Sequence, residues 1–378
     1  MSIFELVKKF KKQLTPHRPL IEVLIYKAHL LHNLKQYQKQ CAKQVIAPVL
    51  KANAYGHGME PVLTCLKGQV LPCVCVDSHF EARVVHKHYP KLNCLVLGYC
   101  RLASIEHTPF SHSAFAITGL EQLQELAQDL TQPKNFHLKL DTGMFRQGIV
   151  SDQFKLAEKL IASNPNIRLQ GIFSHLACPA DELKTHKQIA QWNDAVKFFK
   201  QRFPHIQFWH LSASEGVRYH RQMDSNLIRL GIGFYGWSEQ QAVLALRPAL
   251  ELRSLVTGFK QLKIGDQVGY DYTYTATQAM RLAVVPVGYF EGLDRRLSNQ
   301  SGFFVQGTYC PIVGRISMDM TMVDVTGNKK IAFGDSVQVI SPDPVAKNSL
   351  KVWSEICQTI PYELLVKIPM HLARTVVV

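Results

Sequence analysis

The chain has 378 residues, 47% of them hydrophobic, and a formal net charge of +14. This length exceeds what one hydrophobic core usually organises, so two domains are expected, and the composition argues against a disordered chain. The basic residues are scattered and form no recognisable nucleic-acid-binding motif, so the charge predicts a solvated basic surface rather than a nucleic-acid partner.

The start of the chain and the cysteines both favour a cytoplasmic protein. Residues 1–19 lack the apolar region of a signal peptide, and no apolar stretch approaches the ~20 residues of a membrane span. Between residues 3 and 14, apolar side chains at helical spacing predict a short helix packed on its own domain, with a membrane surface or a partner as the alternative. The nine cysteines form no Cys-x-x-Cys pair, and Cys73 and Cys75 stand in an apolar run typical of a core.

Short β-rich runs alternate with amphipathic stretches through the first two thirds of the chain. Helical patterns occupy stretches such as 119–130, 151–163 and 185–203. Apolar strands that alternate with helices predict parallel βαβ units, and eight units in roughly 200 residues predict a (β/α)8 TIM barrel, an α/β fold. The eight candidate strands are 45–50, 73–76, 93–97, 113–117, 136–140, 169–173, 208–211 and 227–230.

The pattern changes near residue 240. Beyond it, strand-like runs are separated by glycine-containing turn signals, and few long helical patterns remain. This predicts a mostly-β domain over residues 241–378, after a barrel domain over residues 1–240. The barrel does not need an early candidate strand at residues 20–25, so that strand could pair with the second domain.

Polar and glycine-rich clusters follow several of the eight strands. The C-terminal ends of the strands form the active-site face of a (β/α)8 barrel, so these side chains should converge on one mouth. Its candidate residues are Lys51 after the first strand, Lys139 and Arg146 at and after the fifth, His175 after the sixth, Ser214 after the seventh and Arg229 at the end of the eighth.

The loops after strands seven and eight are the usual phosphate site of such barrels. Ser214 supplies a hydroxyl there, and Gly231 and Gly233 let backbone N–H groups approach an anion closely. A phosphorylated ligand is therefore expected. Lys51, at the end of the first strand and facing that ligand, suggests a Schiff base.

Five segments in chain order carry a resemblance to a known family. They are VLKANAYGHG at 49–58, HLKLDTGMFR at 137–146, IRLGIGFYG at 228–236, CPIVGRISMD at 310–319 and TIPYE at 359–363. Together they resemble the motifs of alanine racemases, from about residue 20 to the C-terminus. The resemblance implies pyridoxal 5′-phosphate as cofactor and the interconversion of L- and D-alanine, which supplies D-alanine for cell-wall peptidoglycan.

The resemblance also assigns two bases. Lys51 would hold the cofactor covalently and act on one face of the substrate Cα, and Tyr270 would act on the other. Racemisation needs such a pair, because one group removes the α-proton and another returns it from the opposite side. A phenol of pKa ~10 is a poor base unless its anion is stabilised, and His175 and Arg229 resemble the relay that does this. Arg229 would also face the pyridine nitrogen and keep it unprotonated, because a guanidinium does not give up its proton.

Further residues are implied to bind the cofactor and the substrate. Arg146 resembles a residue that contacts the substrate carboxylate, and Met318 would offer its backbone N–H to the same group. Lys139 resembles a lysine that is carbamylated in many family members, although not in all. The implied cofactor contacts are Lys51, Tyr55, Arg146, His175, Ser214, Arg229, Gly231, Ile232 and Tyr362. The family also implies a homodimer in which Tyr270, Met318 and Asp319 act across the interface.

The sequence departs from the family pattern near the phosphate site and the entrance. Ala213 stands where asparagine is common, and Phe290 and Glu291 replace alanine and aspartate beside Tyr289, which resembles an entrance residue. These changes predict altered access to the site. They leave open a preference for serine or another small amino acid over alanine.

The sequence disfavours three other interpretations. Related decarboxylases present a glutamate to the pyridine nitrogen, where Arg229 stands here, and non-catalytic pyridoxal-phosphate-binding barrels lack a second domain. His86 and His88 lie on a basic helical stretch without further ligands, so we expect them to be surface residues and expect no metal site.

Overall fold

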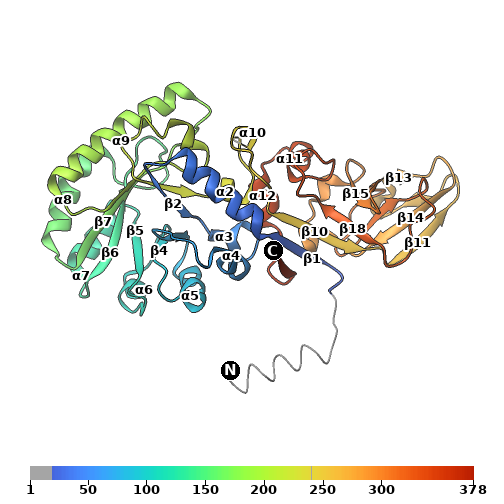
Figure 1. The fold of residues 1–378 in the computed structure, drawn as a ribbon, viewed down its shortest axis with the longest axis horizontal. Helices are drawn as coiled ribbons and strands as arrows, with labels where there is room; N and C mark the ends of the chain where they lie inside the picture. Colours follow the sequence, from blue (N-terminus) through green and yellow to red (C-terminus); the bar gives the residue numbers. More distant parts are fainter. Residues whose placement is uncertain (1–18, 240) are drawn as a thin grey trace, which may run out of the picture.

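The computed structural model describes residues 19–239 and 241–378. The helix expected between residues 3 and 14 lies outside these ranges. Figure 1 shows two parts side by side, a barrel from the first two thirds of the chain and a β-rich part from the last third. A search of the described ranges for a helix with the length and apolarity of a membrane span finds none.

Eight parallel strands form the barrel. They are β2 (Val45–Pro48), β3 (Val74–Val76), β4 (Cys94–Val96), β5 (Ser113–Ile117), β6 (Lys134–Lys139), β7 (Ile167–Phe173), β8 (Phe208–His210) and β9 (Leu227–Leu230). Strands β3 to β8 pair in chain order, and β2 pairs with β9. Isolated bridges, Val49 with Cys75 and Ala213 with Arg229, join the two sets and close the ring. The predicted barrel is confirmed.

Helices connect the barrel strands on the outside. They are α2 (Lys27–Gln40), α4 (Met59–Leu66), α5 (His79–His88), α6 (Leu102–Glu106), α7 (Leu120–Asp129), α8 (Phe154–Ser163) and α9 (Glu182–Arg202). The short element α3 (Lys51–Tyr55) is instead a turn directly after β2 whose backbone is left-handed from Ala52 to Tyr55. Their apolar faces cover the barrel: Trp192, Val196 and Phe199 of α9 are fully buried. The side chain of Asp181 caps the start of α9 by accepting the Lys184 N–H.

Ten strands after the barrel build the second part. They are β10 (Leu250–Leu255), β11 (Gly258–Leu262), β12 (Gln267–Val268), β13 (Tyr274–Thr275), β14 (Met280–Val285), β15 (Gly302–Val305), β16 (Thr308–Pro311), β17 (Thr321–Asp324), β18 (Ser336–Ile340) and β19 (Ala373–Val377). The mostly-β character of this region is confirmed. The early strand β1 (Glu22–Tyr26) lies between β10 and β19 in a six-stranded sheet.

The short helix α12 (Pro361–Val366) lies between the two parts (Figure 1). It packs against the turn after β2, where Gly56 leaves room for it. A Cβ atom on Gly56 would lie 2.0 Å from the carbonyl oxygen of Leu365, and the residue has a φ of +78°. Glycine at this position therefore permits α12, and with it Tyr362, to approach the barrel mouth.

Candidate active site

A cavity of about 840 Å³ lies at the C-terminal ends of the barrel strands. The clusters predicted to converge on one mouth do line this single cavity. The predicted residues on its wall are Lys51, Tyr55, Lys139, Arg146, His175, Ser214, Arg229, Gly231, Ile232 and Tyr362. They come from the ends of barrel strands, from the loops that follow them, and from α12, which the second part of the chain supplies.

The groups predicted to bind a phosphate after β8 and β9 lie close together. The Ser214 hydroxyl accepts the Gly233 N–H at 3.0 Å. A Cβ atom on Gly231 would lie 2.9 Å from the Tyr55 hydroxyl oxygen, so only glycine leaves this space open. Burial raises the pKa of the Tyr55 and Tyr362 phenols, which keeps both protonated as hydrogen-bond donors. Such a donor set fits a phosphate group.

The cavity wall carries four cations alongside three carboxylates, Asp77, Glu215 and Glu363. Lys51, Lys139, Arg146 and Arg229 all line it. Burial, and then the neighbouring cations, lower the pKa of Lys139 to about 8. The Lys139 amine donates a hydrogen bond of 2.8 Å to the side chain of Gln147. Four clustered cations suit a ligand with a phosphate and a carboxylate.

Arg229 is buried, with 4% of its surface exposed. Its guanidinium donates to the carbonyl oxygens of Ser174 at 2.6 Å and Leu211 at 3.1 Å. It also approaches two histidine nitrogens, Nδ1 of His210 at 2.5 Å and Nδ1 of His175 at 3.3 Å. A guanidinium carries donors only, so both Nδ1 atoms must be acceptors.

This geometry fixes the proton positions on both histidines. Burial, and then Arg229, lower the pKa of His175 to about 3, and burial also holds the pKa of His210 well below its usual range. Each ring is therefore neutral near pH 7 and carries its proton on Nε2. His210 Nε2 lies 2.8 Å from Nδ1 of His137, which continues the chain of hydrogen bonds.

Sequence reasoning missed His137 and His210. Both lie on parallel barrel strands, His137 on β6 and His210 at the end of β8, and both are buried. The available signal was a histidine in a strand expected to be buried in the barrel, which marks a side chain that requires a hydrogen-bond partner. That signal does not by itself identify the partners, which are Arg229 for His210 and His210 for His137.

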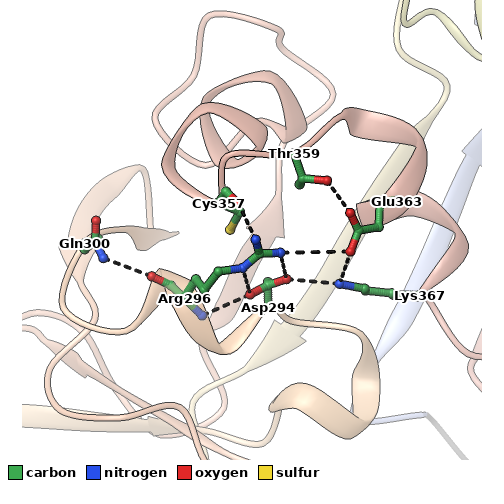
Figure 2. A network of polar contacts seen from close by, with 7 residues as sticks. All are labelled: Asp294, Arg296, Gln300, Cys357, Thr359, Glu363 and Lys367. Atoms are coloured by element: carbon green, nitrogen blue, oxygen red, sulfur yellow. Dashed lines mark hydrogen bonds and ion pairs between the residues drawn. The ribbon is translucent and has the colours of Figure 1, made fainter.

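Helix α12 is tied to the second part of the chain by a network of charges (Figure 2). The Asp294 carboxylate accepts from the Arg296 guanidinium at 2.7 and 2.8 Å and from Lys367 at 3.1 Å. The Arg296 guanidinium holds the pKa of the Asp294 carboxyl well below its usual range. Lys367 also pairs at 2.7 Å with Glu363, the neighbour of Tyr362 in sequence. The network thus fixes the position of α12, which carries Tyr362, a residue predicted to bind the cofactor phosphate.

Comparisons with known proteins agree with this arrangement over nearly the whole chain. Family models described as the N-terminal and C-terminal domains of alanine racemase match residues 25–239 and 249–376. The chain belongs to the alanine racemase family. An alanine racemase of Staphylococcus carnosus is 31% identical over 359 residues, which cover 90% of this chain and 91% of that protein.

Solved alanine racemase structures share the fold. The enzyme of Clostridium difficile 630 superposes with a TM-score of 0.87 at 26% identity, over 96% of each chain. The biosynthetic alanine racemase of Pseudomonas aeruginosa gives 0.83 at 26% identity and covers 96% of this chain and all of its own. The predicted membership of an amino-acid racemase family, and hence of the isomerases, is confirmed.

Two residues that the resemblance assigns to the active site of a partner chain lie away from the Lys51 cavity of their own chain. Tyr270 is 65% exposed, and Met318 is 53% exposed. Tyr270 borders a separate hollow with Tyr289, Arg295 and Ile316 rather than the Lys51 cavity. Strand β13, which follows Tyr270, lies at the end of the second part away from the barrel (Figure 1).

The two residues beside Tyr289 that depart from the alanine racemase pattern, Phe290 and Glu291, have different surroundings. Phe290 is exposed and stacks on His371 with ring centroids 4.8 Å apart. Glu291 is buried, and its carboxylate accepts the Gly288 N–H at 2.7 Å. Glu291 therefore stabilises its own turn. The altered access expected from Phe290 and Glu291 stays a prediction.

The interpretation of His86 as a surface residue is wrong. His86 is 4% exposed, because its ring stacks on Phe110 and its Nε2 lies 2.9 Å from the Ser113 hydroxyl. His88 pairs with Glu60 at 2.8 Å. Among the described residues, no group of three or more His, Cys, Asp or Glu side chains could hold a metal ion.

Proposed function

We propose that this chain interconverts L- and D-alanine with pyridoxal 5′-phosphate as its cofactor. The observation that carries the proposal is the single cavity in which Lys51, the cradle around Ser214 and Gly231, and Arg229 lie together. The open space at Gly231 and the donor groups around it fit the cofactor phosphate. When bound, this cofactor withdraws electrons from the substrate Cα and so acidifies its proton.

The proposed mechanism uses two bases. Lys51 attaches the cofactor and moves the α-proton on one face of the substrate Cα. Tyr270 moves the proton on the opposite face, so that removal by one base and return by the other inverts the centre. Arg146 binds the substrate carboxylate, and Met318 adds its backbone N–H to the same group.

The hydrogen bonds of Arg229 support the proposed relay. Arg229 occupies Nδ1 of His175, so the ring presents its Nε2 proton to a further acceptor. Because the pKa of His175 is lowered to about 3, the ring stays neutral and donates this proton as a hydrogen bond without transferring it. Such a donor would stabilise the phenolate of Tyr270 and make that tyrosine a usable base.

The proposed mechanism needs a homodimer with shared active sites. Tyr270 and Met318 are exposed and lie outside the Lys51 cavity, so a second chain must bring them to it. The stretch from residue 270 to residue 320 also exposes several large aromatic and methionine side chains, which a partner chain would cover. They are Tyr270, Tyr272, Tyr289, Phe290, Met318 and Met320.

Mixing two inactive variants should restore activity. Lys51→Ala and Tyr270→Ala homodimers each lack one base at both sites, whereas the mixed dimer keeps one site with both. After subunit exchange, we expect up to about a quarter of parental activity, since half of the dimers are then mixed and each has one intact site of two. Each variant incubated alone is the control. No recovery despite exchange, followed by native mass spectrometry, would mean that each chain carries a complete site.

The cofactor assignment predicts a yellow protein whose cofactor is fixed to Lys51 by borohydride. The physical reason is that the Lys51 amine lines the cavity that holds the phosphate donors. After reduction and proteolysis, mass spectrometry should place the adduct on the peptide that contains Lys51. Lys51→Ala should lose both the colour and racemisation, whereas Lys155→Ala, on the exposed side of α8, should keep both. An adduct on another lysine would contradict the assignment.

We place this activity in the cytoplasm, where it would supply D-alanine for cell-wall peptidoglycan. The alternative is a racemase that prefers serine or another small amino acid. Incubation of the purified protein with single L-amino acids, followed by separation of enantiomers, distinguishes these substrates. The proposal fails if D-alanine does not form from L-alanine in the presence of the cofactor.

A further inference from the structure

The turn that carries Lys51 has an unusual backbone. Ala52, Asn53, Ala54 and Tyr55, directly after Lys51, have φ values of +53°, +54°, +53° and +51°. None is a glycine, and in this left-handed conformation the Cβ of each residue crowds its own backbone. Four such residues in succession persist only when their surroundings hold them there.

Two backbone hydrogen bonds close the turn internally. The Ala54 N–H donates to the Leu50 carbonyl at 2.7 Å, and the Gly56 N–H donates to the Ala52 carbonyl at 3.1 Å. At the start of the turn, the Ala52 N–H donates instead to a side chain, the Oε1 atom of Glu81, at 2.7 Å. This is the backbone amide next to Lys51.

Glu81 is itself held firmly. It lies in the first turn of α5, and its other carboxylate oxygen, Oε2, accepts the Asp77 N–H at 2.7 Å. The Glu81 N–H donates to the hydroxyl of Ser78, the residue that caps α5. One carboxylate therefore joins the loop after β2 to the loop after β3, with one oxygen on each.

We propose that Glu81 is a positioning residue for Lys51: its carboxylate fixes the left-handed turn from which the Lys51 amine reaches into the cavity. The inference rests on the proposed function, in which Lys51 carries the cofactor and moves a proton. Glu81 is absent from the cavity wall and acts through the backbone of Ala52. Both of its oxygens must accept, which a carboxylate can do and an amide cannot.

The test uses Glu81→Gln in the cofactor-loaded enzyme. An amide of the same shape can satisfy only one of the two N–H groups and turns its NH2 toward the other, and it loses the charge that strengthens both bonds. Hydrogen–deuterium exchange at Ala52, read from peptides that end on either side of it, should speed up about tenfold or more. The rate at which the cofactor is released should rise in the same variant.

The kinetic readout separates positioning from general loss of structure. Misplacing a reacting group lowers kcat, so kcat should fall about tenfold or more while KM for alanine changes by less than about twofold. Glu121→Gln is the matched control, because Glu121 occupies the first turn of α7 and is exposed. This control should leave amide exchange at Ala52, cofactor release and kcat unchanged.

Two results would overturn the inference: parental amide exchange at Ala52 in Glu81→Gln, or faster exchange there without a change in kcat. If Glu81→Gln does not fold, Glu81→Asp keeps the charge but withdraws the oxygens by one methylene, and unchanged exchange at Ala52 in that variant also overturns it. Failure of the proposed function is distinct, because the parent protein itself would then bind no cofactor at Lys51 or racemise no alanine.

Discussion

Arg229→Glu should lower alanine racemisation by roughly 10²-fold or more, the size of effect seen when one preorganised electrostatic contact is lost. Transamination by-products should rise at the same time. The resemblance implies that Arg229 faces the pyridine nitrogen of the cofactor. A carboxylate in its place would favour a protonated nitrogen, which would make the cofactor ring a stronger electron sink and promote transamination. Separation of enantiomers measures the first effect, and formation of pyruvate measures the second.

The surroundings of Arg229 supply the control for this experiment. Its guanidinium donates to the carbonyl oxygens of Ser174, Leu211 and His210, which a carboxylate would repel, so the folding of Arg229→Glu must be checked by its thermal transition. Arg229→Lys keeps a positive charge without the planar fork of donors. We expect this variant to racemise more slowly than the parent without a rise in pyruvate. Normal racemisation by Arg229→Glu would refute the role assigned to Arg229.

The barrel was predictable because local pattern and topology agree. Strands β3, β4 and β5 are buried along their whole length, as their continuous apolar runs indicate. Once eight such strands are parallel, their C-terminal ends must share one face. The sequence pattern alone therefore places Lys51, Ser214 and Arg229 together, although they are far apart along the chain.

The parts that sequence reasoning missed depend on partners that no local pattern names. The left-handed turn after Lys51 contains no glycine between Ala52 and Tyr55, and Glu81 holds it from another loop. The burial of His86 depends on Phe110 and Ser113, which later segments supply. In each case, tertiary contacts override what the residue type alone suggests.

Tyr270→Phe should abolish net racemisation in both directions. It should still allow the α-proton of D-alanine to exchange with solvent deuterium. In the proposed mechanism, Tyr270 serves the α-proton of L-alanine and Lys51 serves that of D-alanine. Loss of a general base typically costs ~10²–10⁴-fold, so deuterium from heavy water should enter L-alanine far more slowly than in the parent. Deuterium should still enter D-alanine, with retention of configuration, because that face keeps Lys51.

Exchange is the deciding measurement because equilibrium thermodynamics requires both net directions of racemisation to fall together. Net rates alone therefore cannot assign a base to a face. Tyr272→Phe is a matched control, since Tyr272 is a neighbouring exposed tyrosine that is 66% accessible; it should exchange both enantiomers at the parental rate. If Tyr270→Phe exchanges L-alanine as fast as the parent, the second base is not this phenol. A single-base or water-mediated route through the Lys51 cavity must then replace the proposed mechanism, and the need for a partner chain to supply Tyr270 would disappear with it.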